Sequence, residues 1–496
     1  MTSLELLKLL GNAQDNYIMD SRKRPKKPQK PPLAKFLAAA ACAVIILGAG
    51  ASMLHLKPWA QNTPSPEDST LEATASPTKS EAPKSADPLG TVSLLAASKA
   101  PAAPVDIADR QEAWQTRHPS DDTAYSMSAF SYRLASQVLS GTQESVCVSP
   151  LTLYEGLSVL ASGSQGATQE QLLSLLGQSD LDALKDQTQR LYEVNQLDYD
   201  PDFLQFSNSL WLDEKENSDS QTGFHQDWVL GAAMDYYCDV YAADFTAPDT
   251  SRALAAWISK NTGGLLDQQL DSLSLPSETV MAVASTVWYR SQWVDNFSED
   301  LTAPDTFTTA AGDIVTCDFM HQTQTSGQVV ETDTYTKSYL QLTSSGSVYF
   351  VLPKEGVDID TLLTEENLWT IFEDGNYIDA DVIWSVPKFT TDSALELGDT
   401  LKALGITDAF DASAADFSAI ADTPLYLSQV TQGTHISLTE NGVEAASYNL
   451  GAMEAGAAEP EEHPEVEMNL NRPFLYLVTA TDGSPLFMGV VRNPEN

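Results

Sequence analysis

An uncharged apolar stretch near the N-terminus limits this chain more than any other feature. The 19 residues from Phe36 to Leu54 carry no charge, and this is close to the length that an α-helix needs to cross a bilayer. The basic segment Arg22–Pro32 precedes them, and the positive-inside rule keeps a basic flank in the cytoplasm. We therefore expect a cytoplasmic basic head over residues 1–32 and a transmembrane signal-anchor over residues 33–56, with the remainder of the chain extracellular.

Two other interpretations of this stretch stay open. A secretory signal would be cleaved near the small residues Gly48–Ser52, although the long basic head and the apolar run favour an anchor. A lipid attached to Cys42 is a weaker alternative, because the apolar sequence continues beyond that residue.

The sequence beyond the apolar stretch divides into a stalk and one globular domain. Residues 57–106 are rich in Pro, Ser, Thr, Ala and Glu, which leaves too little apolar surface to offset the entropy of ordering. Residues 107–496 have the composition of a single globular domain and contain no internal repeats. We expect helices early and strands late, an α+β arrangement. The expected helices are one with the apolar stripe Met127, Phe130, Leu134 and Val138 and one over Thr168–Leu176, and the expected strands are Val280–Tyr289, Val348–Pro353 and Phe474–Ala480.

Composition and motif searches exclude several functions. The chain has 69 acidic and 27 basic residues and a formal charge of -42, so its surface repels nucleic acid. The four cysteines, Cys42, Cys147, Cys238 and Cys317, have neither disulfide nor zinc-ligand spacing, and we interpret them as buried free thiols. The histidines form no metal spacing, and no nucleotide-binding or hydrolase motif occurs. We therefore expect no metal, no cofactor and no enzyme activity.

Late segments of the chain resemble one known family. Asn471–Asn496 reads NRPFLYLVTATDGSPLFMGVVRNPEN and resembles the C-terminal signature of the serpins. Further matches occur in order along the domain. They are Val146–Gly177, Asn208–Leu212, Trp257–Leu266, Trp288–Phe297, Val348–Gly356, Val386–Phe389, Leu401–Ile420 and Leu425–Gly442.

The resemblance implies a serpin fold of three β-sheets with about nine helices and an exposed reactive-centre loop, here about residues 443–465. It also implies a mechanism. A serine protease attacks the loop and forms an acyl-enzyme, and the freed loop then inserts as a central strand of the largest sheet and traps the protease. The partners we expect are serine proteases in a covalent complex and the membrane through the N-terminal helix, and we expect a monomer.

The loop begins with a segment that resembles the family's hinge pattern. Strand alternation would place Val443, Ala445, Ser447, Asn449, Gly451 and Met453 on the inward face after insertion, and would leave the opposite face, with Tyr448 and Leu450, partly exposed. The matching hinge residues are Glu440, Gly442, Val443, Glu444, Ala445, Ala446 and Ser447.

We predict the reactive bond at Gly456–Ala457, from the family's usual distance to the hinge. Ala455, Ala458 and Glu459 are neighbouring candidates, since the loop is about three residues longer than a common family length. The loop has no Lys or Arg, so its small residues favour elastase-like or subtilisin-like targets. The glutamates of the loop leave a Glu-specific protease as an alternative target.

Five residues match the family's sheet-opening cluster, the group of hydrogen bonds that separates when the loop enters: Ser149, Thr152, Ser285, Trp293 and Gln432. Ser285 and Gln432 stand where the family has Asn and His, and we expect this pair to retune the opening and not to abolish it.

The leading hypothesis is a serine-protease inhibitor on the surface of a bacterial cell membrane, with a Gram-positive cell favoured. A non-inhibitory serpin that serves as a surface binding or structural module is the alternative. An intracellular serpin and an unrelated membrane-anchored enzyme have less in their favour.

Overall fold

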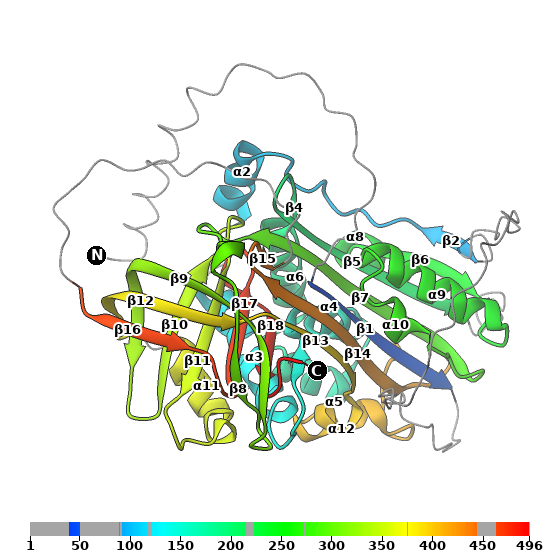
Figure 1. The fold of residues 1–496 in the computed structure, drawn as a ribbon. Helices are drawn as coiled ribbons and strands as arrows, with labels where there is room; N and C mark the ends of the chain where they lie inside the picture. Colours follow the sequence, from blue (N-terminus) through cyan, green and yellow to red (C-terminus); the bar gives the residue numbers. More distant parts are fainter. Residues whose placement is uncertain are drawn as a thin grey trace, which may run out of the picture. The chain divides into compact units, whose positions relative to one another are not determined.

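Two β-sheets of nine strands each organise the computed structural model (Figure 1). All the described residues belong to one compact unit, Leu37–Asn496. The structure describes residues 39–49, 89, 92–117, 121–214, 223–271, 273–373, 375–443 and 463–495.

The first sheet, sheet A, has the order β1-β14-β15-β7-β5-β6-β2, and β1 also pairs with β7. Both β1 and β15 therefore lie between β14 and β7, while β13 extends the sheet beyond β14 and β4 pairs with β5. The strands are β1 (Ala39–Ala49), β2 (Ser93–Ala96), β4 (Leu197–Asp198), β5 (Phe203–Asp213), β6 (Cys238–Ala243), β7 (Thr279–Gln292), β13 (Phe389–Glu396), β14 (Leu425–Thr439) and β15 (Gly442–Val443).

The second sheet, sheet B, has the order β16-β12-β9-β10-β11-β17-β18-β3, with β8 paired to β9. The resemblance implied three sheets, but hydrogen bonding joins the strands into two. The long strand β9 makes the connection, because it pairs with β12 along most of its length and with β10 at its C-terminal end. The strands are β3 (Val146–Val148), β8 (Ala303–Thr308), β9 (Ile314–Glu331), β10 (Tyr335–Gln341), β11 (Ser347–Pro353), β12 (Ile378–Pro387), β16 (Glu465–Asn469), β17 (Phe474–Thr479) and β18 (Pro485–Val491).

Ten α-helices occur in the described parts of the chain, against the nine or so expected. They are α2 (Ile107–Arg117), α3 (Asp121–Val138), α4 (Pro150–Ser162), α5 (Gly166–Leu175), α6 (Leu181–Asn195), α8 (Gln226–Asp235), α9 (Pro248–Asn261), α10 (Asp267–Leu270), α11 (Glu365–Glu373) and α12 (Gly398–Ala403). Short 3-10 turns are η2 (Glu299–Leu301), η3 (Ile359–Leu362) and η4 (Asp408–Phe410).

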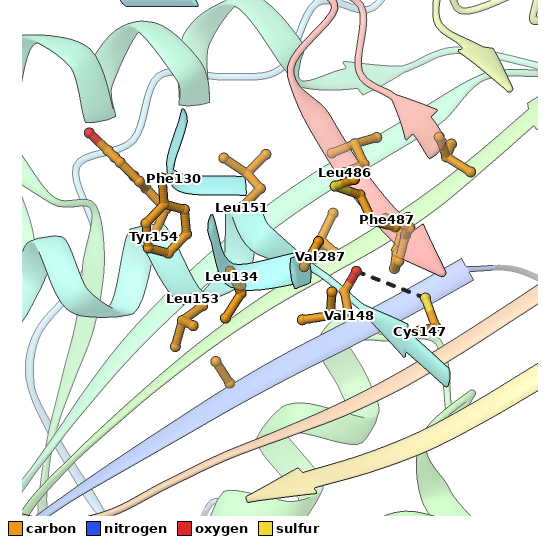
Figure 2. Close-up of a cluster of buried hydrophobic side chains, with 14 of the residues drawn as sticks. Phe130, Leu134, Cys147, Val148, Leu151, Leu153, Tyr154, Val287, Leu486 and Phe487 are labelled. Atoms are coloured by element: carbon orange, nitrogen blue, oxygen red, sulfur yellow. Dashed lines mark hydrogen bonds between the residues drawn. The ribbon is translucent and has the colours of Figure 1, made fainter. Parts of the chain in front are cut away.

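Two helices cover the centre of sheet A. Proline at the first position of α4 has its φ already set for a helix, and nearly every residue of α4 is buried. Figure 2 shows the main core around this helix, where Phe130 from α3 packs against Tyr154 from α4. The two rings meet edge to face, and their centroids are 5.4 Å apart. A second apolar cluster joins the other face of sheet A to α9 through Trp211, Trp257 and Ile258.

The structure confirms the helices and strands expected from periodicity. Met127, Phe130 and Leu134 of α3 are fully buried, and Val138 is half-buried. The other expected elements are present as α5, β7, β11 and β17, and their ends differ from the expected ones by at most three residues. Cys42, Cys147 and Cys238 are buried free thiols as expected, whereas Cys317 is only half-buried.

The N-terminal part of the chain differs from the expectation. Ala39–Ala49, inside the expected membrane-spanning helix, forms strand β1 of sheet A. Ser93–Ala96, inside the expected stalk, forms strand β2, which pairs with β6 and ends the sheet on that side. The backbone N–H and C=O groups of an apolar segment can all be hydrogen-bonded either within a helix or between two neighbouring strands of a sheet. Here the neighbouring strands of sheet A provide the hydrogen-bond partners. Among the described residues, none of the helices combines the length and apolarity that a bilayer crossing requires.

Candidate functional site

The candidate site is the position between β7 and β14 in sheet A, which we call the central slot. Most of it is filled by β1, antiparallel to both neighbours (Figure 1). Ala43 of β1 pairs with Ser285 of β7 on one side and with Gln432 of β14 on the other. Each backbone edge of β1 therefore has a strand beside it, as in any central strand.

The hinge occupies the top of the same slot as β15. Gly442 pairs with Gln292 and Val443 with Ser291, and on the other side they pair with Thr439 and Leu438. Gly442 has a φ of 132°, and a Cβ there would lie 2.3 Å from the backbone oxygen of Ser291. Only glycine fits this turn of the chain from β14 back into the sheet. Val443 is fully buried.

Glu440 fixes the hinge from outside the slot. Its carboxylate accepts a hydrogen bond from Thr302 Oγ1 at 2.9 Å and pairs with Lys388 Nζ at 3.0 Å. Burial alone would raise the pKa of this carboxyl, but hydrogen bonds from its own backbone N–H, Lys388 and Thr302 outweigh burial and lower the pKa. The charged form is therefore the one that holds the turn.

Trp293 completes the top of the slot, as its match to the family's aromatic residue implied. Its indole Nε1 donates to the carbonyl oxygen of Thr439 at 3.0 Å, and its backbone N–H donates to that of Asn441 at 3.2 Å. The ring is buried and packs edge to face on Phe297. Trp293 thus holds both residues that flank Glu440.

Gln432 brings three of the five predicted cluster residues together. Its Oε1 accepts from the backbone N–H of Ser149 at 2.9 Å. Its Nε2 donates to the backbone oxygen of Ser149 at 2.8 Å and to Thr152 Oγ1 at 2.9 Å. The side-chain amide therefore clamps β14 to the N-terminus of α4.

Ser285 does not join this cluster, contrary to the expected Ser285–Gln432 pair. Ala43 of β1 stands between the two residues and pairs with each. The hydroxyls of Ser285 and Ser149 are buried and have no hydrogen-bond partner among the described residues. The cluster is therefore in its separated form, with a strand already in the slot.

The two faces of β1 are both buried, which corrects the expectation that one face of the slot stays partly exposed. Ala43, Ile45 and Leu47 belong to the main core, as does Val443. Cys42, Val44 and Ile46 pack into the cluster under α9 and are also buried. Any strand in this part of the slot therefore needs apolar or small residues on both faces.

Most of the predicted loop lies outside the described residues. Glu444, Ala445, Ala446 and Ser447 of the hinge are among these, as are the reactive-bond candidates Ala455, Gly456, Ala457, Ala458 and Glu459. The described chain resumes at His463 and enters β16, which is parallel to β12 at the end of sheet B. The loop thus connects the central slot of one sheet to an edge strand of the other.

The family model for the serpins, described as serine protease inhibitors, matches residues 125–494. The chain belongs to the serpin family. It therefore has the serpin fold, and the general function of the family is protease inhibition. The matched residues include the central strands β7 and β14, the hinge and the cluster around Gln432.

Curated relatives of this serpin come from several organisms. An uncharacterized serpin-like protein of Methanosarcina acetivorans is 26% identical over 75% of this chain and 88% of its own length. Mouse Serpin B11 is 25% identical over 71% of this chain and 94% of its own. Wheat Serpin-Z2B is 26% identical over 74% of this chain and 94% of its own.

Solved serpin structures share the fold. The thermophilic serpin tengpin in its native state matches 81% of this chain and all of its own, with a TM-score of 0.64 and 21% identity. Arabidopsis AtSerpin1 in its native stressed conformation matches 76% of this chain and all of its own, with a TM-score of 0.61 and 24% identity.

Sequence reasoning missed the residues that fill and shape the slot of this serpin. Ile45 belongs to the stretch expected to cross a bilayer, and its Cδ1 instead lies 2.9 Å from where a Cβ of Gly156 in α4 would stand. Lys388 and Thr302, which hold Glu440, lie more than 50 residues from it in the sequence. The close match of hinge residues could have directed attention to what faces Glu440, but no local pattern identifies these partners.

Proposed function

We propose that this serpin inhibits serine proteases as a suicide substrate. The observation that carries the proposal is the course of the hinge. Gly442 and Val443 enter the central slot antiparallel to β7 and β14, and Val443 is fully buried in the main core. A strand that continued in this direction would run down the centre of sheet A and gain ladder hydrogen bonds on both edges.

The chemistry follows from a cut within the loop. The protease serine Oγ attacks the carbonyl carbon of Gly456, the bond to Ala457 breaks, and the new amino group of Ala457 leaves with a proton. An ester then joins Gly456 to the protease. Insertion of residues 444–455 before water reaches this ester would trap the acyl-enzyme, since about ten new hydrogen bonds contribute roughly 0.5–1.5 kcal/mol each.

Loop composition supports the choice of target. Between Val443 and Glu465 the chain has no Lys or Arg, so a protease with an acidic primary pocket finds no matching side chain. Gly456 and the alanines beside it fit the shallow pockets of elastase-like or subtilisin-like enzymes. We assign these two classes as targets and Glu-specific proteases as the next class.

The location we propose is the outer face of a bacterial cell membrane, with the inhibitor as a monomer. The uncharged residues Phe36–Leu54 and the basic segment before them support a single N-terminal anchor. The serpin domain would then meet secreted proteases at the surface, at the end of the Pro-rich segment.

One observation favours a second candidate, a non-inhibitory serpin that acts as a binding or structural module. The central slot is filled by β1, and a filled slot leaves no room for the loop. In that case proteases would cut the loop and remain active.

Incubation with an elastase and with a subtilisin separates the two candidates. The inhibitor is expected to form a complex that survives denaturation in SDS, together with loss of protease activity. Loop cleavage with full protease activity, both in buffer and after insertion of the chain into vesicles, would support the module and exclude inhibition.

A further inference from the structure

β1 occupies the positions that the cleaved loop would need. Val443 pairs with Ser291, so a strand that continues without a bulge places Ala445 opposite Tyr289, and Ala39 of β1 already pairs with Tyr289. By the same count Asn449 would take the position of Ala43, opposite Ser285. The N-terminal segment and the loop thus exclude each other from the central slot.

The segment fits this slot better than the loop does. Ile45 packs over Gly156, where α4 offers no Cβ, and the loop would place Gly451 there. Cys42 lies on the face under α9 with the apolar residues of that helix, where the loop would place the much larger Tyr448. Ala43 is compatible with an apolar core, whereas Asn449 would bring a side-chain amide into it.

Two buried hydroxyls indicate that the slot also has an empty form. Ser285 Oγ and Ser149 Oγ have no partner within the described chain while β1 is in place. Removal of β1 would let β7 and β14 pair directly, which would bring Ser285 next to Gln432. Most buried polar groups in native structures have a hydrogen-bond partner, so a group without one needs an explanation.

The same residues cannot serve two structures at once. Phe36–Leu54 is the uncharged stretch that fits a bilayer, and Ala39–Ala49 within it forms β1. We propose that β1 is an intramolecular competitor of the reactive-centre loop, and that insertion of this segment into a membrane withdraws it and switches the inhibitor on. The proposal rests on the inhibitory function proposed above. Outside a membrane the chain would be a protease substrate only.

A disulfide between β1 and β7 would report where the segment lies. Cys42 pairs directly with Thr286, and opposite residues of antiparallel strands have Cα atoms about 4.5–5.5 Å apart, within the range of a disulfide. The full chain carrying Thr286→Cys is oxidised in buffer and after reconstitution into vesicles of phosphatidylethanolamine and phosphatidylglycerol. The control carries Cys42→Ala as well and cannot form this bond.

The expected result is a bond between positions 42 and 286 in buffer and its loss in vesicles. Without oxidation, the same chain should be cleaved by a subtilisin in buffer without inhibiting it and should form an SDS-stable complex in vesicles. Absence of the bond in buffer would overturn the proposal, as would an oxidised chain that still traps the protease. A bond that behaves as expected without any complex in vesicles would support the strand exchange and overturn the inhibitory function instead.

Proline substitution tests the competition without a membrane. Ala43→Pro with Ile45→Pro removes two ladder donors from β1, while Ala51→Pro lies beyond its last residue and is the control. In buffer the double variant should form an SDS-stable complex with a subtilisin and inactivate it, whereas the control should be cleaved without inhibition. Equal behaviour of the double variant and the control would overturn the proposal.

Discussion

Ser285 of β7 and Gln432 of β14 are held one strand apart, because Ala43 of β1 pairs with both of them. These are the two residues that depart from the family's pattern in the sheet-opening cluster. Gln432 keeps a full set of partners on α4, whereas the Ser285 hydroxyl has none among the described residues. The hydrogen bonds between β14 and the N-terminus of α4 are therefore intact while β1 fills the slot.

Gln432→Leu should destabilise the chain by about 2–4 kcal/mol, because it leaves the buried N–H of Ser149 without its side-chain acceptor and removes the donor that Gln432 Nε2 provides to the Ser149 carbonyl and to Thr152 Oγ1. The midpoint of urea unfolding measures the change. Gln429→Leu is the control, since Gln429 is more exposed and its side chain donates to Glu396, which is also at the surface; the change should cost less than about 0.5 kcal/mol. Equal losses in the two variants would show that the clamp contributes nothing.

Gly442→Ala should cost about 2–4 kcal/mol, because a Cβ there would meet the backbone of Ser291 and Gln292. Gly483→Ala is a matched control. Gly483 also has a positive φ, of 88°, but open space around it, so only about 1 kcal/mol of backbone strain is expected. If the two variants unfold at the same urea concentration, the hinge does not sit in the slot as described.

The free energy of unfolding should decrease as the pH rises from about 4.5 to about 8, through Glu155 of α4. Burial raises the pKa of this carboxyl to about 8 in the fold, although Asn208 Nδ2 donates to it at 3.2 Å. Over that window the folded chain keeps a proton that the unfolded chain releases, so the contribution of Glu155 to stability is greatest below pH 4.5 and falls by up to about 1.4 kcal/mol per pH unit.

Glu155→Gln carries no titrating group and should flatten this part of the profile. Urea unfolding of both chains between pH 5 and 8 makes the comparison. Profiles that run parallel would mean that Glu155 is ionised in the fold.

Gly456→Arg should redirect inhibition toward trypsin-like proteases, whose acidic pocket binds an arginine side chain. The expected outcome is an SDS-stable complex with trypsin that the unchanged chain does not form, because its loop has no Lys or Arg. The chain is tested in vesicles or with the Ala43→Pro and Ile45→Pro changes. Cleavage after the introduced arginine without a complex would place the reactive bond elsewhere in the loop.

Regular elements and family membership could be predicted from the sequence, because they depend on local periodicity and on ordered motifs. The stripe of Met127, Phe130 and Leu134 describes one buried helix face, and the hinge pattern around Gly442 describes one backbone turn. Each of these features has a physical cause within a few residues of chain.

The strand β1 could not be predicted this way. A strand buried on both faces has apolar residues at every position, so Cys42–Leu47 shows no alternation and matches a membrane helix equally well. Whether the segment forms a strand or a membrane helix depends on whether Thr279–Tyr289 and Leu425–His435 have backbone groups free to pair with it. These residues lie hundreds of positions away in the sequence.

Partners of the hinge were missed for the same reason. Lys388 directly precedes β13 and Thr302 directly precedes β8, and neither position has a sequence signal that points to Glu440. The merger of two expected sheets into sheet B likewise depends on the length of β9, which no single motif specifies.

The mass of the product formed with a subtilisin in vesicles tests the central claim most directly. The account predicts one covalent species that contains the protease and this chain up to Gly456, together with a released peptide, Ala457–Asn496. The protease in the covalent species should be inactive. An unmodified, active protease beside a chain cut in two would contradict the account.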